Sequence, residues 1–238
     1  MDKHKVRLVA KVFSQVLSID YTKTFSLVEK MNSIHLTLAI EVAQRWVVHQ
    51  MDVKSAFLKG DLYEEIYMEK PQGFIHDATL VCKLKKSIYG LKQAPRAWYA
   101  KMDSFLLSKG FTKYHSNLNV YILQRDDSHF LLVLYVDDLI IAGSTASIID
   151  NVKATLQDRI LMKNLGLLHY FLGIEIHQSS SGITLSQPKY ALDLIARFHM
   201  SDCKAASTPF LSGVKLEAKC SAPLVDATLY RWLEVSST

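Results

Sequence analysis

The sequence contains little cysteine and no long uninterrupted apolar run. Its 238 residues include three widely spaced cysteines, Cys82, Cys203 and Cys220, which suit a reducing compartment and form neither a disulfide framework nor a zinc pattern. No apolar stretch reaches the roughly 18 residues that a membrane span needs. The charged N-terminus is not followed by the apolar core of a signal peptide. We therefore expect an intracellular protein without a membrane anchor.

Composition is otherwise that of an ordinary globular protein. Hydrophobic residues make up 49% of the chain and charged residues 21%, so a sizeable core is available. The formal net charge of +5 leans mildly toward an anionic partner, but many basic proteins never bind nucleic acid. There is no internal repeat and no low-complexity tract.

Apolar periodicity predicts a mixture of helices and strands. Asn32 or Ser33 is a plausible N-cap for a helix. Pro95 and Gly110 bracket another helix, whose core stripe consists of Trp98, Met102, Phe105 and Leu106. Helices are expected at 34–46, 95–109, 148–160 and 188–200. Strands are expected at 5–13, 46–53, 139–143, 168–178 and 183–187, with a strand followed by a loop within 64–74 and a hairpin over 120–136.

Two adjacent carboxylates interrupt the most apolar stretch of the chain, HFLLVLYVDDLIIAG at 129–143. Asp137 and Asp138 would escape burial at the tip of a two-residue turn, although Asp-Asp is a poor choice for a tight turn. Neighbouring carboxylates also repel each other. A divalent cation would offset both costs, because Mg²⁺ binds through one or two carboxylates together with substrate phosphates.

A solvated surface turn is the alternative interpretation of this pair, and a third carboxylate favours the metal site. Asp52 ends the apolar segment WVVHQMDV in the same way as Asp137 ends FLLVLYVD. If the two strands are neighbours in one sheet, three carboxylates meet at one edge. Two cations about 4 Å apart can then hold the attacking and leaving oxygens of a phosphoryl transfer.

The chain resembles the reverse transcriptase domain of Ty1/copia-type LTR retrotransposon polyproteins. Eight strings carry the resemblance in the order of the family, from about residue 5 to 210: KVRLVAKVFSQ, IDYTKTFSLV, VHQMDVKSAFLKGDLYEEIYMEKPQGF, CKLKKSIYGLKQAPRAWY, LYVDDLIIAG, MKNLGLLHYFLGIEI, LSQPKYALDLI and STP. Each string alone is weak, but together they are specific.

The resemblance implies an α+β right-hand polymerase fold, with a mostly antiparallel palm sheet backed by helices. Residues 1–178 would form partial fingers and the palm. Residues 179–238 would form the start of the thumb or connection and an irregular tail. RNase H, integrase and protease regions are not expected in this chain.

The resemblance also implies the chemistry. Asp52, Asp137 and Asp138 match the catalytic aspartates of the family and would bind two Mg²⁺ ions, with Mn²⁺ as a possible substitute. The reaction would be attack of a primer 3′-hydroxyl on the α-phosphate of a deoxynucleoside triphosphate, on an RNA or DNA template. Positioning and charge neutralisation supply most of the catalysis in phosphoryl transfer.

Three positions match the family's contacts to the incoming nucleotide. Phe57 resembles the bulky gate that would clash with a ribose 2′-hydroxyl, and the alternative is an ordinary core phenylalanine. Arg7 resembles the fingers arginine that grips the triphosphate, where a planar fork suits phosphate oxygens. Lys5 is a second such cation. For both cations the alternative is a solvated strand edge.

Two further segments take roles by the same matching. Gly90, Lys92 and Gln93 resemble the segment that lines the nucleotide and template pocket, and the alternative is an ordinary helix entry. Gly90 would allow close backbone approach. Leu172 and Gly173 resemble the primer grip, and the alternative there is a turn between core strands.

The sequence departs from the family at several positions, and the resemblance implies that it would start inside the fingers. At five positions the chain has a different residue from the one that is usual in the family: Val12, Ser18, Leu27, Asn117 and Asn164. The remainder of the Pol polyprotein would be the partner in the full element, in the cytoplasm within a virus-like particle or in the nucleus. We expect the isolated chain to fold into a palm-like unit, to bind Mg²⁺ weakly, and to polymerise poorly or not at all.

Two other functions compete with polymerisation. A catalytically inactive remnant could bind nucleic acid through a basic run with interleaved aromatics, formed by Lys83, Lys85, Lys86, Lys92 and Arg96 with Tyr89 and Trp98. The same run could instead be a solvent-exposed surface that binds no ligand. A palm-type nucleotide cyclase would need a Gly-Gly-acidic hairpin, which the sequence lacks.

Overall fold

The structure is a computed structural model that describes residues 6–24, 31–71, 73–74, 77, 79–115, 117–205, 226–228 and 231. The chain divides into two compact units. The first consists of residues 1–169 and 178–183, and the second of residues 170–177 and 184–238. The proposed boundary between palm and thumb at residue 178 stays a prediction.

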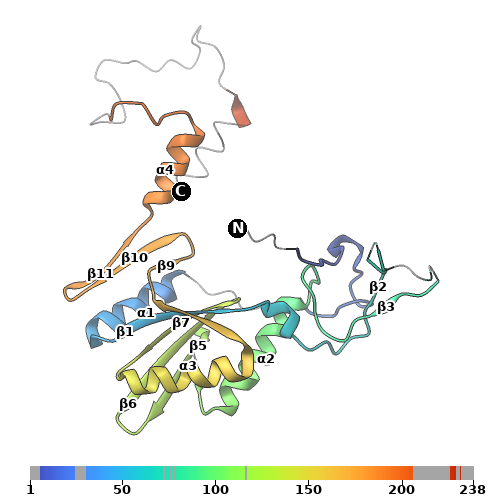
Figure 1. The fold of residues 1–238 in the computed structure, drawn as a ribbon, viewed down its shortest axis with the longest axis horizontal. Helices are drawn as coiled ribbons and strands as arrows, with labels where there is room; N and C mark the ends of the chain where they lie inside the picture. Colours follow the sequence, from blue (N-terminus) through green and yellow to red (C-terminus); the bar gives the residue numbers. More distant parts are fainter. Residues whose placement is uncertain are drawn as a thin grey trace. The chain divides into compact units, whose positions relative to one another are not determined.

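A six-stranded sheet forms the centre of the first unit (Figure 1). Its strand order is β4-β5-β6-β7-β1-β8, and every neighbouring pair is antiparallel. The expected α+β class with a mostly antiparallel sheet is therefore confirmed. The strands are β1 (Val47–Val53), β4 (Thr112–Tyr114), β5 (Asn117–Arg125), β6 (Ser128–Tyr135), β7 (Asp138–Gly143) and β8 (Met162–Leu167).

Helices cover both faces of this sheet, which explains the continuous apolar runs in β6 and β7. All residues from Phe130 to Leu134 are buried, as expected for a central strand with no solvent face. α2 (Ala94–Ser108) and α3 (Ala146–Ile160) enclose the main core on one face. α1 (Met31–Gln44) lies on the other side of the sheet from α3 (Figure 1).

The helical stripe predicted between Pro95 and Gly110 is confirmed in α2. Trp98, Met102 and Leu106 are almost fully buried, and Phe105 packs against the same core at its margin. Two short elements connect this helix with the strands: a 3-10 helix η2 (Ala56–Lys59), and a small ribbon of β2 (Tyr67–Met68) with β3 (Cys82–Lys83). η2 packs against α2.

The second unit contains β9 (Tyr170–Phe171), which pairs with the start of β10 (Ile174–Ser179). β11 (Gly182–Ser186) completes a three-stranded sheet in the order β11-β10-β9, of which residues 178–183 around the β10–β11 turn belong to the first unit. α4 (Pro188–Arg197) begins at the proline that predicted its start. No helix among the described residues is long and apolar enough to cross a membrane.

Two expectations of local structure in the N-terminal part of the chain are wrong. The segment 5–13 was expected to be a strand, but its described part forms one bridge, Val9 to Tyr89, and runs into a 3-10 helix η1 (Val12–Ser14). A single edge contact cannot hold a strand against competing local turns. α1 starts at Met31, so neither Asn32 nor Ser33 is its N-cap.

Candidate active site

The sheet brings Asp52 and Asp138 directly opposite each other. β1 and β7 are antiparallel neighbours, and their register pairs these two residues. The amide N–H of Val53 donates to the carbonyl oxygen of Asp137 at 2.8 Å, which joins β1 to the β6–β7 turn. Three aspartates that are distant in sequence therefore share one edge of the sheet, as the sequence pattern predicted.

The turn itself is placed one residue earlier than expected. Both aspartates were predicted at its tip, but Val136 and Asp137 form the turn and Asp138 is the first residue of β7. Tyr135 pairs with Asp138 across the hairpin. Because side chains alternate along a strand, this register orients Asp138 by the sheet rather than by a turn.

Burial and neighbouring charges raise the pKa of Asp138. Desolvation is the largest cause, and the negative charges of Asp137 and Asp52 act in the same direction. A hydrogen bond from Gln50 Nε2 to Asp138 Oδ1 at 3.1 Å opposes the increase by stabilising the carboxylate. The edge of the sheet therefore concentrates negative charge in a half-buried position.

Gln50 is a residue that sequence reasoning missed. It is buried, and it lies two residues before Asp52 on the same face of β1. A polar residue at i−2 from a candidate ligand, on the same face of the strand, was the available signal. Its amide fixes the orientation of the Asp138 carboxylate.

These residues fit a divalent cation. Carboxylate oxygens are the ligands of hard cations, and mutual repulsion among the three aspartates would be relieved by one. In the part of the chain that is described, no group of three or more His, Cys, Asp or Glu side chains, the three aspartates included, is arranged so that it could hold a metal ion. Mg²⁺ sites commonly use one or two carboxylates and take further oxygens from phosphates and water.

The predicted nucleotide contacts Arg7 and Phe57 meet on one tyrosine. The Arg7 guanidinium lies 5.0 Å from the centroid of the Tyr89 ring, and Phe57 packs edge-on against the same ring at 5.1 Å. The carbonyl oxygen of Phe57 accepts a hydrogen bond from the buried Ser87 hydroxyl. Tyr89 therefore connects two residues that resemblance had assigned to the same ligand.

Gly90 allows the N-terminal segment to approach closely. Its φ is +88°, and an added Cβ would lie 2.3 Å from the carbonyl oxygen of Ala10. The amide of Ala10 donates to the carbonyl of Tyr89 at 2.8 Å. The close approach predicted for this glycine is thus made to the chain's own backbone.

Lys92 and Gln93 hold the same N-terminal segment. Gln93 is almost fully buried; its amide donates to the carbonyl of Asp20 at 2.9 Å and accepts from Gln15 Nε2 at 3.1 Å. Lys92 Nζ donates to the Tyr21 hydroxyl at 3.0 Å. The side chains of both residues are engaged within the protein, and their contact with nucleotide or template stays a prediction.

The structure does not test the roles predicted for Lys5, Leu172 and Gly173. Lys5 lies outside the described residues. Leu172 and Gly173, with φ of +50° and +84°, form the turn between β9 and β10 in the second unit, so the primer-grip assignment also stays a prediction.

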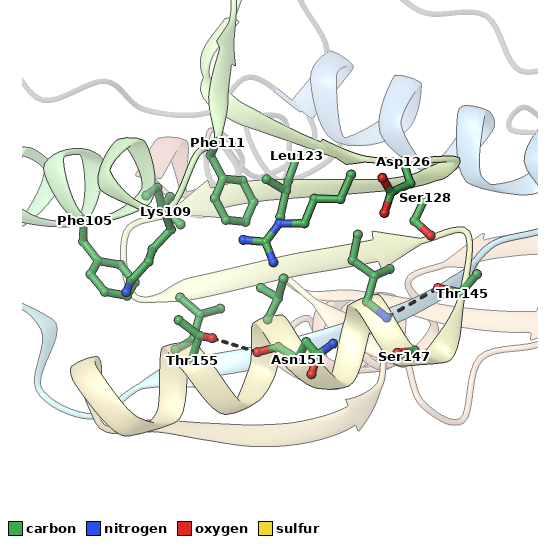
Figure 2. A pocket seen from close by; sticks show the side chains of 15 residues that line it. Phe105, Lys109, Phe111, Leu123, Asp126, Ser128, Thr145, Ser147, Asn151 and Thr155 are labelled. Carbon is green, nitrogen blue, oxygen red and sulfur yellow. Dashed lines mark hydrogen bonds between the residues drawn. The ribbon is translucent and has the colours of Figure 1, made fainter.

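A separate cavity of about 370 Å³ lies between α2 and α3 (Figure 2). Its lining includes Asp126 in the β5–β6 turn and Ser128, the first residue of β6, at the opposite end of β6 from Asp137. Figure 2 shows Phe105 and Lys109 of α2 facing Asn151 and Thr155 of α3 across it. The cavity is therefore not part of the carboxylate site.

Comparison with known proteins agrees with this arrangement. A family model described as reverse transcriptase (RNA-dependent DNA polymerase) matches residues 1–212. The chain is 42% identical over 233 residues to the retrovirus-related Pol polyprotein from transposon RE1 of Arabidopsis thaliana, covering 97% of this chain and 16% of that protein. It is 43% identical over 229 residues to the corresponding polyprotein from transposon TNT 1-94 of Nicotiana tabacum, covering 94% and 17%.

A shorter relative is matched over more of its length. The putative transposon Ty5-1 protein of Saccharomyces cerevisiae is 35% identical over 184 residues, which are 76% of this chain and 60% of that protein. The chain spans only about a sixth of the two plant polyproteins. The chain belongs to the reverse transcriptase (RNA-dependent DNA polymerase) family, in the group found in copia-type Pol polyproteins.

Proposed function

We propose that this chain carries the polymerase site of an RNA-directed DNA polymerase. The observation that carries the proposal is the register of β1 and β7, which sets Asp52 opposite Asp138, beside Asp137. Family membership supplies the reaction class. The substrates would be a template–primer duplex and deoxynucleoside triphosphates, and the remainder of a Pol polyprotein would supply the other domains.

The residues of the chain would act by positioning. Asp52 and Asp138, from neighbouring strands, would hold hard divalent cations at the sheet edge, and Asp137 would add a third carboxylate from the turn. Two Mg²⁺ ions bound there would lower the pKa of the primer hydroxyl and neutralise charge on the triphosphate. Gln50 keeps the Asp138 carboxylate oriented during this process.

Arg7 and Phe57 would define the nucleotide side of the site. The Arg7 fork can bind phosphate oxygens, and its stacking on Tyr89 limits its motion. Phe57 would exclude a ribose 2′-hydroxyl, because its backbone is fixed by Ser87 and its ring by Tyr89. A Phe57→Val variant is expected to accept ribonucleotides more readily than the wild type.

Binding of nucleic acid without catalysis is less well supported. Within the basic run, Lys83 pairs with Glu65 and Lys86 pairs with Asp61. These ion pairs reduce the positive charge that the run offers to phosphates. RNA binding that weakens steeply with salt, without extension of a primer, would favour this alternative.

A primer-extension assay on poly(rA)/oligo(dT) tests the proposed function. We expect weak extension by the purified chain with Mg²⁺ or Mn²⁺, and its loss in Asp137→Asn. The matched control is Asp127→Asn, because Asp126 and Asp127 form a second adjacent pair at the β5–β6 turn. Extension by Asp137→Asn equal to that of the control would refute the proposal.

A further inference from the structure

The β6–β7 turn is held by a side chain that lies outside the sheet. Trp98 of α2 is 2% exposed, and its Nε1 donates a hydrogen bond to the carbonyl oxygen of Val136 at 2.6 Å. Val136 immediately precedes Asp137. The sequence pattern assigned Trp98 to core packing, which is correct but incomplete, since a buried indole N–H also needs an acceptor.

Val136 needs external support because its backbone is strained. Its φ is +52°, in the left-handed region that β-branched residues rarely occupy. Such residues persist where the surroundings over-determine them, and they cluster at functional sites. Two hydrogen bonds fix this turn, one from Trp98 to Val136 and one from Val53 to the carbonyl of Asp137.

Trp98 is itself placed by close packing against η2. An added Cβ on Gly60, the residue after η2, would lie 2.9 Å from the backbone nitrogen of Trp98 and 2.9 Å from the Ala97 Cβ. Ala56, at the start of η2, is buried in the same core as Trp98. α2 also follows directly on Lys92 and Gln93. Trp98 therefore provides a structural connection between residues 92–93, which precede α2, and the strained turn that carries Asp137.

We propose that Trp98 is a positioning residue for catalysis. Its hydrogen bond to the Val136 carbonyl fixes the positions of Asp137 and Asp138 relative to Asp52. This inference rests on the proposed polymerase function. Trp98 acts through the backbone of the turn and is not expected to contact nucleotide or cation. A displacement of about 1 Å at reacting groups can cost roughly 100-fold in rate.

The kinetic test compares Trp98→Phe with Trp46→Phe in the intact chain. Trp98→Phe keeps an aromatic ring in the core and removes the N–H donor. Trp46 stacks on His129 instead, at the end of β1 away from Asp52. We expect Trp98→Phe to lower kcat about 10- to 100-fold and to raise the Mg²⁺ concentration for half-maximal rate, with little change in KM for the nucleotide. Values equal to those of Trp46→Phe would overturn the proposal.

Relief of the backbone strain gives a second variant. Glycine occupies positive φ without steric cost, so Val136→Gly should make the turn less dependent on its support. The fold-loss caused by Trp98→Phe is then expected to be smaller in the Val136→Gly background than in the wild type. Equal losses in both backgrounds would show that Trp98 does not act through this turn.

A spectroscopic readout does not depend on activity. In the wild-type chain, the Trp98 indole N–H resonance should exchange slowly with solvent and shift when Mg²⁺ is added, and Asp137→Asn should abolish that shift. Fast exchange, or a shift that persists in Asp137→Asn, would overturn the proposal for Trp98 even if Trp98→Phe fails to fold. If the wild type extends a primer no better than Asp137→Asn, the polymerase function is contradicted but the inference about Trp98 is not. The indole resonance would then still test whether Trp98 positions the turn.

Discussion

Glu41 of α1 is a buried carboxyl group that makes the stability of the protein depend on pH. Its side chain is fully buried, and neither carboxyl oxygen has a hydrogen-bond partner among the described residues. Burial alone raises the pKa of Glu41 from 4.5 to about 8. The protein therefore keeps this group protonated at neutral pH in the folded state.

The sign of the effect follows from proton binding in the two states. Between pH 4.5 and about 8 the unfolded chain releases the proton of Glu41 while the folded chain keeps it. The contribution of Glu41 to stability is therefore most favourable below pH 4.5, falls as pH rises, and is wholly lost above about pH 8. At about 1.4 kcal/mol per pKa unit, the rise from 4.5 to about 8 corresponds to on the order of 5 kcal/mol.

Glu41→Leu removes the titrating group and keeps a side chain of similar size. We expect its free energy of unfolding, measured by urea denaturation, to exceed that of the wild type by several kcal/mol at pH 9 and by much less at pH 5. Glu69→Leu is the matched control, because the Glu69 side chain is 88% exposed. If Glu41→Leu and Glu69→Leu show the same pH dependence, the carboxyl of Glu41 is not held neutral by burial.

Two other predictions concern the packing around the candidate site. Gly90→Ala should speed hydrogen exchange at the Ala10 amide, because the added Cβ would clash with the Ala10 carbonyl. Gly110→Ala is the control and should leave that exchange unchanged, because Gly110 has a similar φ of +89° but the nearest atom to its added Cβ lies at 3.8 Å. Equal exchange in both variants would contradict the close approach. Burial, and then the charge of Lys153, lowers the pKa of His49, whose Nδ1 lies 2.9 Å from Lys153 Nζ. Lys153→Met should raise the pKa of His49 in an NMR titration, because one of the two causes that lower it is removed. An unchanged value would exclude the charge of Lys153 as a cause.

Strong periodic patterns predicted the centre of the fold well. The apolar runs on either side of Asp137 and Asp138 became β6 and β7, and the apolar segment ending near Asp52 became β1. Each pattern reflects burial on both sheet faces, so local sequence carries the information. The same patterns led to the expectation that the carboxylates meet at one edge, which the register of β1 and β7 bears out.

Elements that depend on a partner rather than on their own composition were missed. β8 contains Lys163, Asn164 and Gly166, and it becomes a strand by pairing with β1 at the sheet edge. Edge strands are short and polar, so they carry little periodic signal. Conversely, the alternating segment 5–13 has the pattern of a strand, but its described residues, from Val6 on, make only one bridge, between Val9 and Tyr89.

The supporting residues of the site required three-dimensional information. Resemblance identified the aspartates, but the hydrogen bonds of Gln50 to Asp138 and of Trp98 to Val136 join residues 88 and 38 positions apart. A helical stripe predicts that Trp98 is buried without revealing which carbonyl its indole reaches. The left-handed backbone of Val136 is equally invisible in the sequence, since valine gives no signal for a positive φ.

The most direct test of the shared carboxylate site is titration of the purified chain with Mn²⁺ alone, followed by electron paramagnetic resonance. We predict that Asp52→Asn weakens Mn²⁺ binding at least about tenfold, a loss of about 1.4 kcal/mol, because residue 52 lies opposite Asp138. Asp126→Asn, in the other adjacent pair, should bind as the wild type does. Wild-type affinity in Asp52→Asn would contradict the account.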